Sequence, residues 1–362
     1  MKYIFIENPA AGAKKSHDTY KDIKKCLKDN IDCEFILTTE PGNATSVARE
    51  MAAKYGKSCI IFACGGDGTL SEVASGVRDY GCAVGVLPMG TGNDFAKKIY
   101  GDMTLEEIAR GFGLYEGSPK VETTDIDCIR TGDVSCINVM SLGFDTKVLK
   151  LANKLSTNYP FLGKICYKLA LVLSLFSSMK FTARFELDIL GNDGEITRLD
   201  ETRDFTLCAV CNASYYGGGF CPAKDSKLDD GVLDLVIAKD LNLIQIAGMI
   251  KHYIAGDVHK SHPHLVSTYR VVGGTLSAVE IETLALNCDG NPIDVLSADF
   301  KVERGGFKLA YFRNHAMSCA VCNPDCMLIE EEETEAPEPA PTVEEEYISS
   351  LEPSEIFAEE MK

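Results

Sequence analysis

The stretch from Cys59 to Val77, CIIFACGGDGTLSEVASGV, places three glycines around Asp67 directly after an apolar run. An uninterrupted apolar run over 59–63 predicts a strand that is buried on both faces, and a helical pattern follows over 69–79. Glycine lets the backbone approach a ligand closely, and the N–H groups at a helix N-terminus bind anions. The stretch therefore predicts a phosphate-binding loop. A tight turn without a ligand is the simpler alternative.

Two further glycine loops also follow predicted strands. Asn8-Pro9-Ala10-Ala11-Gly12 comes after the strand predicted at 2–6, and PMGTGND over 88–94 comes after the one at 83–87. The carboxyl ends of strands in an open parallel sheet face one crevice, so we expect the three loops to converge there. No loop has the G-x-x-x-x-G-K-[ST] or the G-x-G-x-x-G pattern. A carboxylate such as Asp67 suits this site if it shares Mg²⁺ or accepts a loop or nucleotide N–H.

Strand and helix patterns alternate in the first third of the chain. The strands are predicted at 2–6, 33–37, 59–63 and 83–87, and the helices at 16–29, 44–55, 69–79 and 95–99. This alternation predicts an α/β domain over residues 1–121 with a Rossmann-like, mostly parallel sheet and helices on both faces.

The rhythm changes after about residue 121. Strands are predicted at 134–140, 181–190, 205–212, 232–238, 269–272, 277–281, 284–287 and 307–312, with helical patterns only at about 147–178 and 243–255. Residues 122–316 are therefore expected to form a β-rich antiparallel sandwich. A Cys-rich segment at 317–329 and a disordered acidic tail at 330–362 follow.

Charge and hydropathy restrict the class of protein. The net charge of the 362 residues is −18, of which residues 330–362 carry thirteen Glu and one Lys, or −12, and the rest carry −6. No basic footprint for nucleic acid is present. We expect no secretory leader, because the apolar start is short, and no membrane span, because lysines interrupt the apolar stretch at 160–181. A cytosolic protein with mostly reduced thiols is predicted.

Several motifs, in order along residues 1 to 312, resemble those of the diacylglycerol kinase catalytic-domain family. They are NP with Gly12, GGDGT with Glu72, PMGTGNDF, SLGFD at 141–145, GGG at 217–219, PA at 222–223, LDDGVLD at 228–234 and DG at 289–290. The family also contains sphingosine and ceramide kinases, and the chain is most similar to the bacterial soluble diacylglycerol kinases. GGDGT alone also occurs in NAD kinases, so PMGTGNDF and LDDGVLD are the specific motifs.

The resemblance implies that ATP lies in the crevice between the two domains. The matching nucleotide-contacting positions are Asn8, Pro9, Ala10, Ala11, Gly12, Thr39, Gly65, Gly66, Asp67, Gly68, Thr69, Leu70, Ser71, Glu72, Gly90, Thr91, Asn93 and Asp94.

The resemblance also implies that Asp289 is the general base, and a positioned carboxylate suits the removal of a hydroxyl proton during phosphoryl transfer. A plain hairpin turn at Asp289-Gly290 is the alternative. Family members commonly have Glu where this chain has Asn291, which leaves the metal arrangement beside Asp289 open.

A structural Mg²⁺ site is implied for the loop KLDDGV. Its ligands would be the Asp230 carboxylate and the main-chain carbonyls of Lys227 and Val232, and few protein oxygens with added water are normal for Mg²⁺. The alternative is a β-turn without a metal.

Other parts of the sequence allow more than one interpretation. Cys319, Cys322 and Cys326, with His315, have spacing that allows Zn²⁺, but free thiols are favoured. Cys208 and Cys211 are expected on opposite faces of one strand. The apolar stretch at 161–180 is either core, which is favoured, or a membrane-docking segment. His259, in a family-like G-x-x-H segment, receives no catalytic role.

The sequence thus predicts an ATP- and Mg²⁺-dependent kinase that phosphorylates diacylglycerol to phosphatidate, cytoplasmic with peripheral membrane contact. A sphingoid base or another lipid alcohol is the alternative substrate. NAD kinase and a non-catalytic nucleotide-binding regulator are the rivals from other classes. ATP and a membrane lipid are the predicted partners, no nucleic acid is expected, and a homodimer is left open.

Overall fold

The computed structural model describes residues 1–12, 14–27, 31–159, 169–170, 173–174, 179–279 and 283–322. Its first elements are β1 (Lys2–Glu7), α1 (Lys14–Leu27), β2 (Cys33–Leu37), α2 (Asn43–Tyr55), the 3₁₀-helix η1 (Gly56–Ser58), β3 (Cys59–Gly65), α3 (Asp67–Val77), β4 (Ala83–Pro88), α4 (Asp94–Tyr100) and α5 (Leu105–Gly111). Strands β2, β1, β3 and β4 pair in that order, all in parallel. The predicted α/β half is therefore confirmed.

The later elements are mostly strands. They are β5 (Glu122–Thr131), β6 (Val134–Cys136), β7 (Val139–Gly143), α6 (Phe144–Asn158), β8 (Phe181–Leu190), β9 (Ile196–Cys211), β10 (Leu233–Lys239), α8 (Leu243–Ala255), α9 (Val258–Ser261), β11 (Val266–Ala278), β12 (Leu284–Cys288), β13 (Asn291–Val295), β14 (Ser297–Tyr311) and α10 (His315–Ala320). Apart from the β14–β4 contact, the pairings among these strands are antiparallel, as the sequence predicts.

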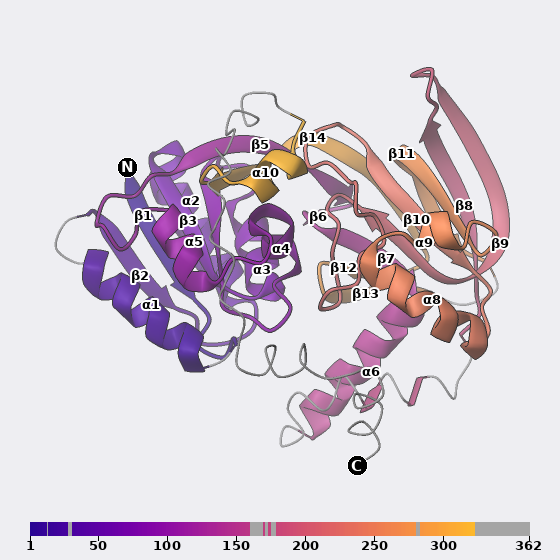
Figure 1. Cartoon of the computed structure of the whole chain (residues 1–362), viewed down its shortest axis with the longest axis horizontal. Helices are drawn as coiled ribbons and strands as arrows, with labels where there is room; N and C mark the ends of the chain where they lie inside the picture. The colour runs from indigo at the N-terminus through magenta and orange to yellow at the C-terminus, as the bar shows by residue number, and fades with distance from the viewer. Residues whose placement is uncertain are drawn as a thin grey trace, which may run out of the picture. The chain divides into compact units, whose positions relative to one another are not determined.

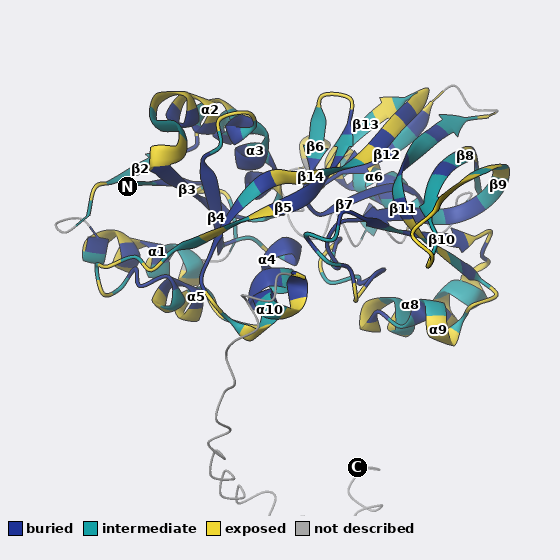
Figure 2. Cartoon of the chain, turned by 90° about the horizontal axis from the view of Figure 1, so that it is seen from above, coloured by how far each residue is buried: buried dark blue, intermediate teal, exposed yellow. Residues whose placement is uncertain are grey.

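Strand β14 joins the two halves into one sheet. It pairs in parallel with β4 at Leu309 and Val84 and runs antiparallel to β5 along most of its length. In the described part of the chain, fourteen strands are connected in this way (Figure 1). Figure 2 shows buried residues along the central strands and exposed residues on the outer helices.

Hydrophobic cores lie on both sides of this junction. The first core contains Leu309 of β14 and Ile126 of β5, and the second contains Phe300 and Ile129 from the same two strands. Burial of these large side chains, each worth about 1.5–3 kcal/mol, couples the two halves through shared strands.

The second core lies between two layers of the C-terminal half. Leu235 and Ile237 of β10 point into it, whereas Val236 and Ala238 point to the outer face, where a third core lies under α8. Cys208 belongs to the second core and Cys211 to the third, so the prediction that these thiols lie on opposite faces is confirmed.

The strand predicted at 134–140 is wrong as a single element. The structure ends β6 at Cys136 and begins β7 at Val139. The strand is interrupted because the N–H groups of Ile137, Asn138 and Val139 turn to the carboxylate of Asp289.

The strands predicted at 269–272 and 277–281 form one strand, β11, as far as Ala278. Gly273 and Gly274 do not end it. They lie where the backbones of the neighbouring strands approach, and a Cβ at Gly274 would overlap the carbonyl oxygen of Glu186. The final residues of the second prediction lie outside the described residues.

Two other predicted strands are much longer than expected. The one at 205–212 begins at Ile196 as β9, and the one at 307–312 begins at Ser297 as β14. The added part of β9 is mostly polar and charged and pairs with β8, whereas the added part of β14 alternates apolar and charged residues and pairs with β11. β5, β13, α5 and α10 had no sequence prediction.

Some predictions fall on undescribed parts of the chain. These are most of the helical pattern at 147–178 beyond α6, most of the apolar stretch at 161–180, the Cys-rich segment from residue 323 and the tail. Within the described residues, no helix is both long and apolar enough to cross a bilayer.

Candidate active site

The glycine loops after β3 and β4 are in direct backbone contact. The N–H groups of Met89 and Gly90 donate to the carbonyl oxygen of Gly65 at 2.8 and 3.2 Å. A Cβ at Gly90 would overlap the Cα of Gly66. Residue 90 must therefore be glycine for the loops to lie this close, and a Cβ at Gly66 would lie only 3.1 Å from the Cα of Gly90.

The loop after β1 completes the cradle. The Asn8 side chain donates to Thr69 Oγ1 at 3.1 Å, and its own carbonyl oxygen Oδ1 accepts the N–H of Ala10. Gly12 has φ +69°, and a Cβ there would overlap the carbonyl oxygen of Met89. The three loops predicted to converge do lie side by side, which confirms that geometric prediction.

His17 of α1 supports the same loop, and no sequence pattern singled it out. Its Nε2 lies 2.9 Å from the carbonyl oxygen of Ala11, and its Nδ1 lies 3.0 Å from the buried Glu7. The imidazole thus ties the end of β1 to the loop that follows.

Asp67, the carboxylate among the glycines, binds a backbone N–H of the next loop. Its Oδ1 accepts the N–H of Phe95 at 3.0 Å, at the start of α4. A Cβ at Gly92 would lie 3.1 Å from Asp67 Oδ2 and 3.4 Å from Asp94 Oδ2. The carboxylates of Asp67 and Asp94 therefore flank one glycine at the cradle.

Asp94 is 5% exposed and carries an oxygen, Oδ1, without a hydrogen-bond partner. Its Oδ2 accepts the N–H of Gly218 at 2.7 Å. Burial, with a smaller contribution from the negative charge of Asp67, raises the pKa of Asp94, the Gly218 N–H offsets part of this rise, and the resulting pKa is about 6. An unpaired buried carboxylate oxygen beside a second carboxylate is a donor set that fits Mg²⁺ together with phosphate oxygens and water.

The cradle also fits a phosphate chain. The three glycine loops lie together beside the start of α3, and no atom lies within 4 Å of a Cβ built at Gly68. This open backbone at a helix N-terminus is the environment that binds phosphate. Thr91 in the third loop is exposed, and Asn93 (φ +55°) bonds to Gly90 through both side-chain atoms.

Several predicted nucleotide positions have other contacts. Leu70 is 2% exposed and its side chain lies in the first core. The Glu72 carboxylate accepts the N–H groups of Gly42 and Ala44 at 3.0 and 3.1 Å and so caps α2. Thr39 donates to the side chain of Asn43, which keeps it beside the same helix terminus.

Asp289 lies in the two-residue turn between β12 and β13, with φ +48° followed by Gly290 at +88°. The hairpin alternative is therefore correct as a description of the backbone. The side chain also forms hydrogen bonds. Its Oδ1 accepts from Asn138 N, Val139 N and Cys136 Sγ, while Oδ2 accepts, among the described residues, only from Ile137 N at 2.8 Å.

Burial raises the pKa of Asp289, and the bonds from Cys136 and the three N–H groups offset part of this rise. A carboxylate has about four lone-pair sites, so Oδ2 retains one that can accept a proton. In the same hairpin, Asn291 Nδ2 lies 3.3 Å from the hydroxyl of Ser71 on α3 and links the two halves.

The loop predicted to hold Mg²⁺ has a different cation. Arg270 donates to Asp230 Oδ2 at 2.6 Å, and Val232 N donates to Oδ1. Around this loop, a Cβ at Gly231 would overlap the guanidinium of Arg304. Within the residues that the structure describes, no group of three His, Cys, Asp or Glu side chains could hold a metal ion. The predicted site uses one carboxylate and two main-chain carbonyls, which such a group does not describe, so the Mg²⁺ site stays a prediction.

The Cys-rich segment is described only in part. His315 Nε2 lies 3.7 Å from Cys319 Sγ, and Cys326 lies outside the described residues. The choice between Zn²⁺ and free thiols therefore stays open.

Lys98 of α4 crosses to the C-terminal half. Its ammonium donates to Ser214 Oγ at 2.7 Å and to the carbonyl oxygen of Ser226 at 2.5 Å. Burial lowers the pKa of Lys98 to about 8. No sequence pattern predicts these contacts, because the partners of Lys98 are 116 and 128 residues away in the chain.

A cavity of about 450 Å³ lies between α6, α8 and the sheet. Its walls are almost entirely apolar, with Val148, Leu241 and Met249 among them, and Gly217 lines one part. Polar groups in the lining include Asp145, whose pKa burial raises and whose Oδ2 has no partner, and Tyr216 and Tyr253, whose hydroxyls lie 3.1 Å apart.

The cavity adjoins the glycine cradle. Gly217 lines the cavity, and the next residue, Gly218, donates to Asp94. The fold and the site together define a class: an α/β lobe with a phosphate-binding cradle, continuous with a β sandwich that holds an apolar cavity.

Comparison with known proteins supports this class. The diacylglycerol kinase catalytic domain matches residues 2–126, and the YegS C-terminal NAD kinase beta sandwich-like domain matches residues 138–311. The diacylglycerol kinase of Bacillus subtilis (strain 168) is 28% identical over 82% of this chain and 91% of that protein. "Probable lipid kinase YegS-like" of Xanthomonas campestris pv. campestris (strain 8004) is 28% identical over 76% of this chain and 85% of that protein.

A solved structure shows the same fold. A diacylglycerol kinase from Bacillus anthracis str. Sterne aligns with a TM-score of 0.59 at 21% identity, over 87% of this chain and 98% of that one. The chain therefore carries the two domains of the diacylglycerol kinase and YegS-like lipid kinases, as its motifs predict.

Proposed function

We propose that this chain transfers the γ-phosphoryl group of ATP to the hydroxyl of diacylglycerol, with Mg²⁺, and yields phosphatidate. The observation that carries the proposal is the adjacency of the two sites: Gly217 lines the apolar cavity, and Gly218 bonds to Asp94 at the cradle. A lipid in the cavity would therefore present its hydroxyl beside a bound triphosphate.

In this proposal, residues 1–121 bind the nucleotide and residues 122–316 bind the lipid. The backbone of Asn8–Gly12 and of Gly65–Thr69 would hold the phosphates, and Thr91 and Asn93 would complete the third loop. Asp67 and Asp94 would hold Mg²⁺, which neutralises phosphate charge when bound. The predicted structural ion at Lys227, Asp230 and Val232 would compete with Arg270.

Asp289 is the proposed general base. As the lipid oxygen bonds to the γ-phosphorus and the bond to ADP breaks, the hydroxyl proton would pass to Asp289 Oδ2, the oxygen with a free lone pair. The four hydrogen bonds to its carboxylate would hold it in one orientation during the transfer.

One observation favours a sphingoid base as the alternative substrate. Asp145 places a buried carboxylate oxygen without a partner at the cavity, and an ammonium group would satisfy it more strongly than a hydroxyl would. NAD kinase and a non-catalytic regulator have no such support.

The test is phosphoryl transfer by the purified chain from labelled ATP with Mg²⁺ to dioleoylglycerol, sphingosine or NAD. We expect labelled phosphatidate, no labelled NAD, and a rate that Asp289→Asn abolishes while Asp133→Asn, in the exposed turn between β5 and β6, preserves it. If the chain prefers sphingosine, sphingosine takes the place of diacylglycerol as the proposed substrate. A full rate in Asp289→Asn would exclude Asp289 as the general base.

A further inference from the structure

Helix α8 exposes large apolar side chains to the surroundings of the protein. Twelve such side chains are exposed in the described part of the chain, and four of them belong to this helix of 13 residues. They are Leu243 (49% exposed), Ile244 (84%), Ile250 (42%) and Ile254 (52%).

The inner side of α8 is apolar as well. Met249 is buried in the third core, and Ile246 and Tyr253 pack against it. Lys251 is the only Asp, Glu, Lys or Arg in the helix. The helix also carries Gln245, Lys251 and His252, but its four exposed large apolar side chains form a surface that is better suited to an apolar partner than to water.

The exposed side of α8 continues into the apolar cavity. Leu243, Ala247 and Ile250 are exposed and also line the cavity wall. A lipid could move from an apolar surface against α8 into the cavity without its acyl chains crossing water. This continuity favours a bilayer over a second protein chain as the partner of α8.

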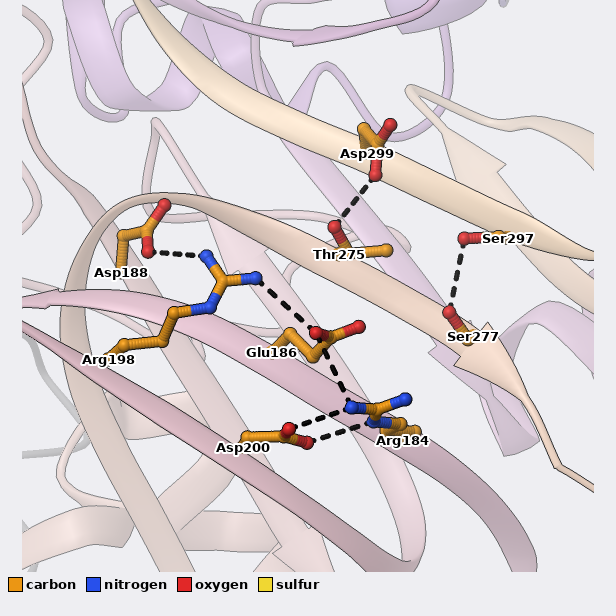
Figure 3. A network of polar contacts seen from close by, with 9 residues as sticks. All are labelled: Arg184, Glu186, Asp188, Arg198, Asp200, Thr275, Ser277, Ser297 and Asp299. Atoms are coloured by element: carbon orange, nitrogen blue, oxygen red, sulfur yellow. Dashed lines mark hydrogen bonds and ion pairs between the residues drawn. The ribbon is translucent and has the colours of Figure 1, made fainter.

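The opposite layer of the C-terminal half has a different surface. Arg184 bonds to Asp200 and Arg198 bonds to Asp188 at 2.7–2.9 Å on the outer face of β8 and β9 (Figure 3). Such ladders of ion pairs suit water. Helices α8 and α9 lie along another edge of the molecule (Figure 2).

Charge also fits a lipid surface. The chain carries a net charge of −18, which repels anionic surfaces over long range, whereas α8 has one lysine and no acidic residue. Attachment through α8 therefore depends on apolar burial, and uncharged phosphatidylcholine is sufficient for it.

We propose that the exposed face of α8, formed by Leu243, Ile244, Ile250 and Ile254, docks on the bilayer and admits the lipid substrate to the cavity. This inference rests on the proposed lipid kinase function. Ile244 and Ile254 contact the bilayer and do not line the cavity, so they separate docking from catalysis.

The experiment measures co-flotation of the full-length chain with phosphatidylcholine vesicles that contain dioleoylglycerol. Ile244→Glu and Ile254→Glu are compared with Ile196→Glu, a control at a 58% exposed isoleucine on β9. Each α8 variant should bind vesicles at least about tenfold more weakly, because the apolar burial of one isoleucine is lost. The control should bind as the wild type does.

Phosphorylation of a water-soluble short-chain diacylglycerol is measured in parallel. We expect the α8 variants to retain this rate and to lose the rate on vesicles. Unchanged vesicle binding by both variants would overturn the docking proposal. A dimeric wild type that Ile244→Glu makes monomeric, with vesicle binding intact, would assign the face to a second copy of the chain. If the wild type phosphorylates neither substrate, the proposed function itself fails.

Discussion

Asp94 offers a sharp test of the site, because its removal should stabilise the fold while it abolishes activity. The carboxylate is 5% exposed, lies beside Asp67 and has one oxygen without a partner. Its pKa rises from 3.8 to about 6, which at about 1.36 kcal/mol per pKa unit corresponds to about 3 kcal/mol of unfavourable free energy at neutral pH.

The variant Asp94→Asn removes this charge and keeps an oxygen that can accept the N–H of Gly218. The new amide group costs about 1 kcal/mol if its own N–H groups lack partners. We therefore expect a net gain of about 1–2 kcal/mol in the free energy of unfolding at pH 7. The melting temperature should rise by a few degrees.

The gain should depend on pH in one direction. Because the folded state raises this pKa, the wild type takes up a proton and gains stability relative to the variant as pH falls. The advantage of Asp94→Asn should be full above pH about 6 and should vanish below pH about 4, where the unfolded wild type is also protonated.

The assay is urea or thermal denaturation of both proteins across this pH range, with phosphoryl transfer measured beside it. Asp133→Asn, in an exposed turn, is the control and should change neither stability nor activity. A variant that is less stable than the wild type at pH 7, or whose advantage is the same in acid, would show that Asp94 is not a strained buried carboxylate.

Three other predictions concern the loops and the base. Gly90→Ala should destabilise the fold by about 1–3 kcal/mol and weaken ATP binding, because the new Cβ would overlap Gly66. Denaturation measures the first effect and calorimetry the second. An unchanged affinity for ATP would contradict a phosphate-binding cradle at these loops. Asp289→Asn should lower kcat on a soluble diacylglycerol by about 10²–10⁴-fold with little change in KM. Arg270→Ala should lower stability by up to about 1 kcal/mol, and Mg²⁺ should then raise the melting temperature of the variant more than that of the wild type, since Asp230 becomes available. If Mg²⁺ raises the melting temperature of both proteins by the same amount, the result would instead support the metal site as predicted.

Local patterns predicted much of the fold. The strands at 33–37 and 181–190 have the bounds expected from the sequence, and the helix at 243–255 does as well. These elements are short, strongly periodic and bounded by turn residues, so local propensity agrees with the tertiary environment.

The failed predictions have non-local causes. Residues 137–139 leave the strand pattern because their N–H groups bind Asp289, about 150 residues later in the sequence. β9 extends through a charged segment because it forms ion pairs with β8, and β14 extends because Glu303 and Asp299 pair with Arg130 of β5 and Thr275 of β11. Such partners are invisible in a local window.

The sequence by itself determined the class of the site: three glycine loops after parallel strands must meet at one edge of the sheet, because the carboxyl ends of those strands share that edge. The tertiary structure decided which side chains act there. Only folding placed Gly218 on Asp94, Arg270 on Asp230 and the apolar side of α8 at the mouth of the cavity, since burial, pKa and pairing depend on contacts between residues far apart in the chain.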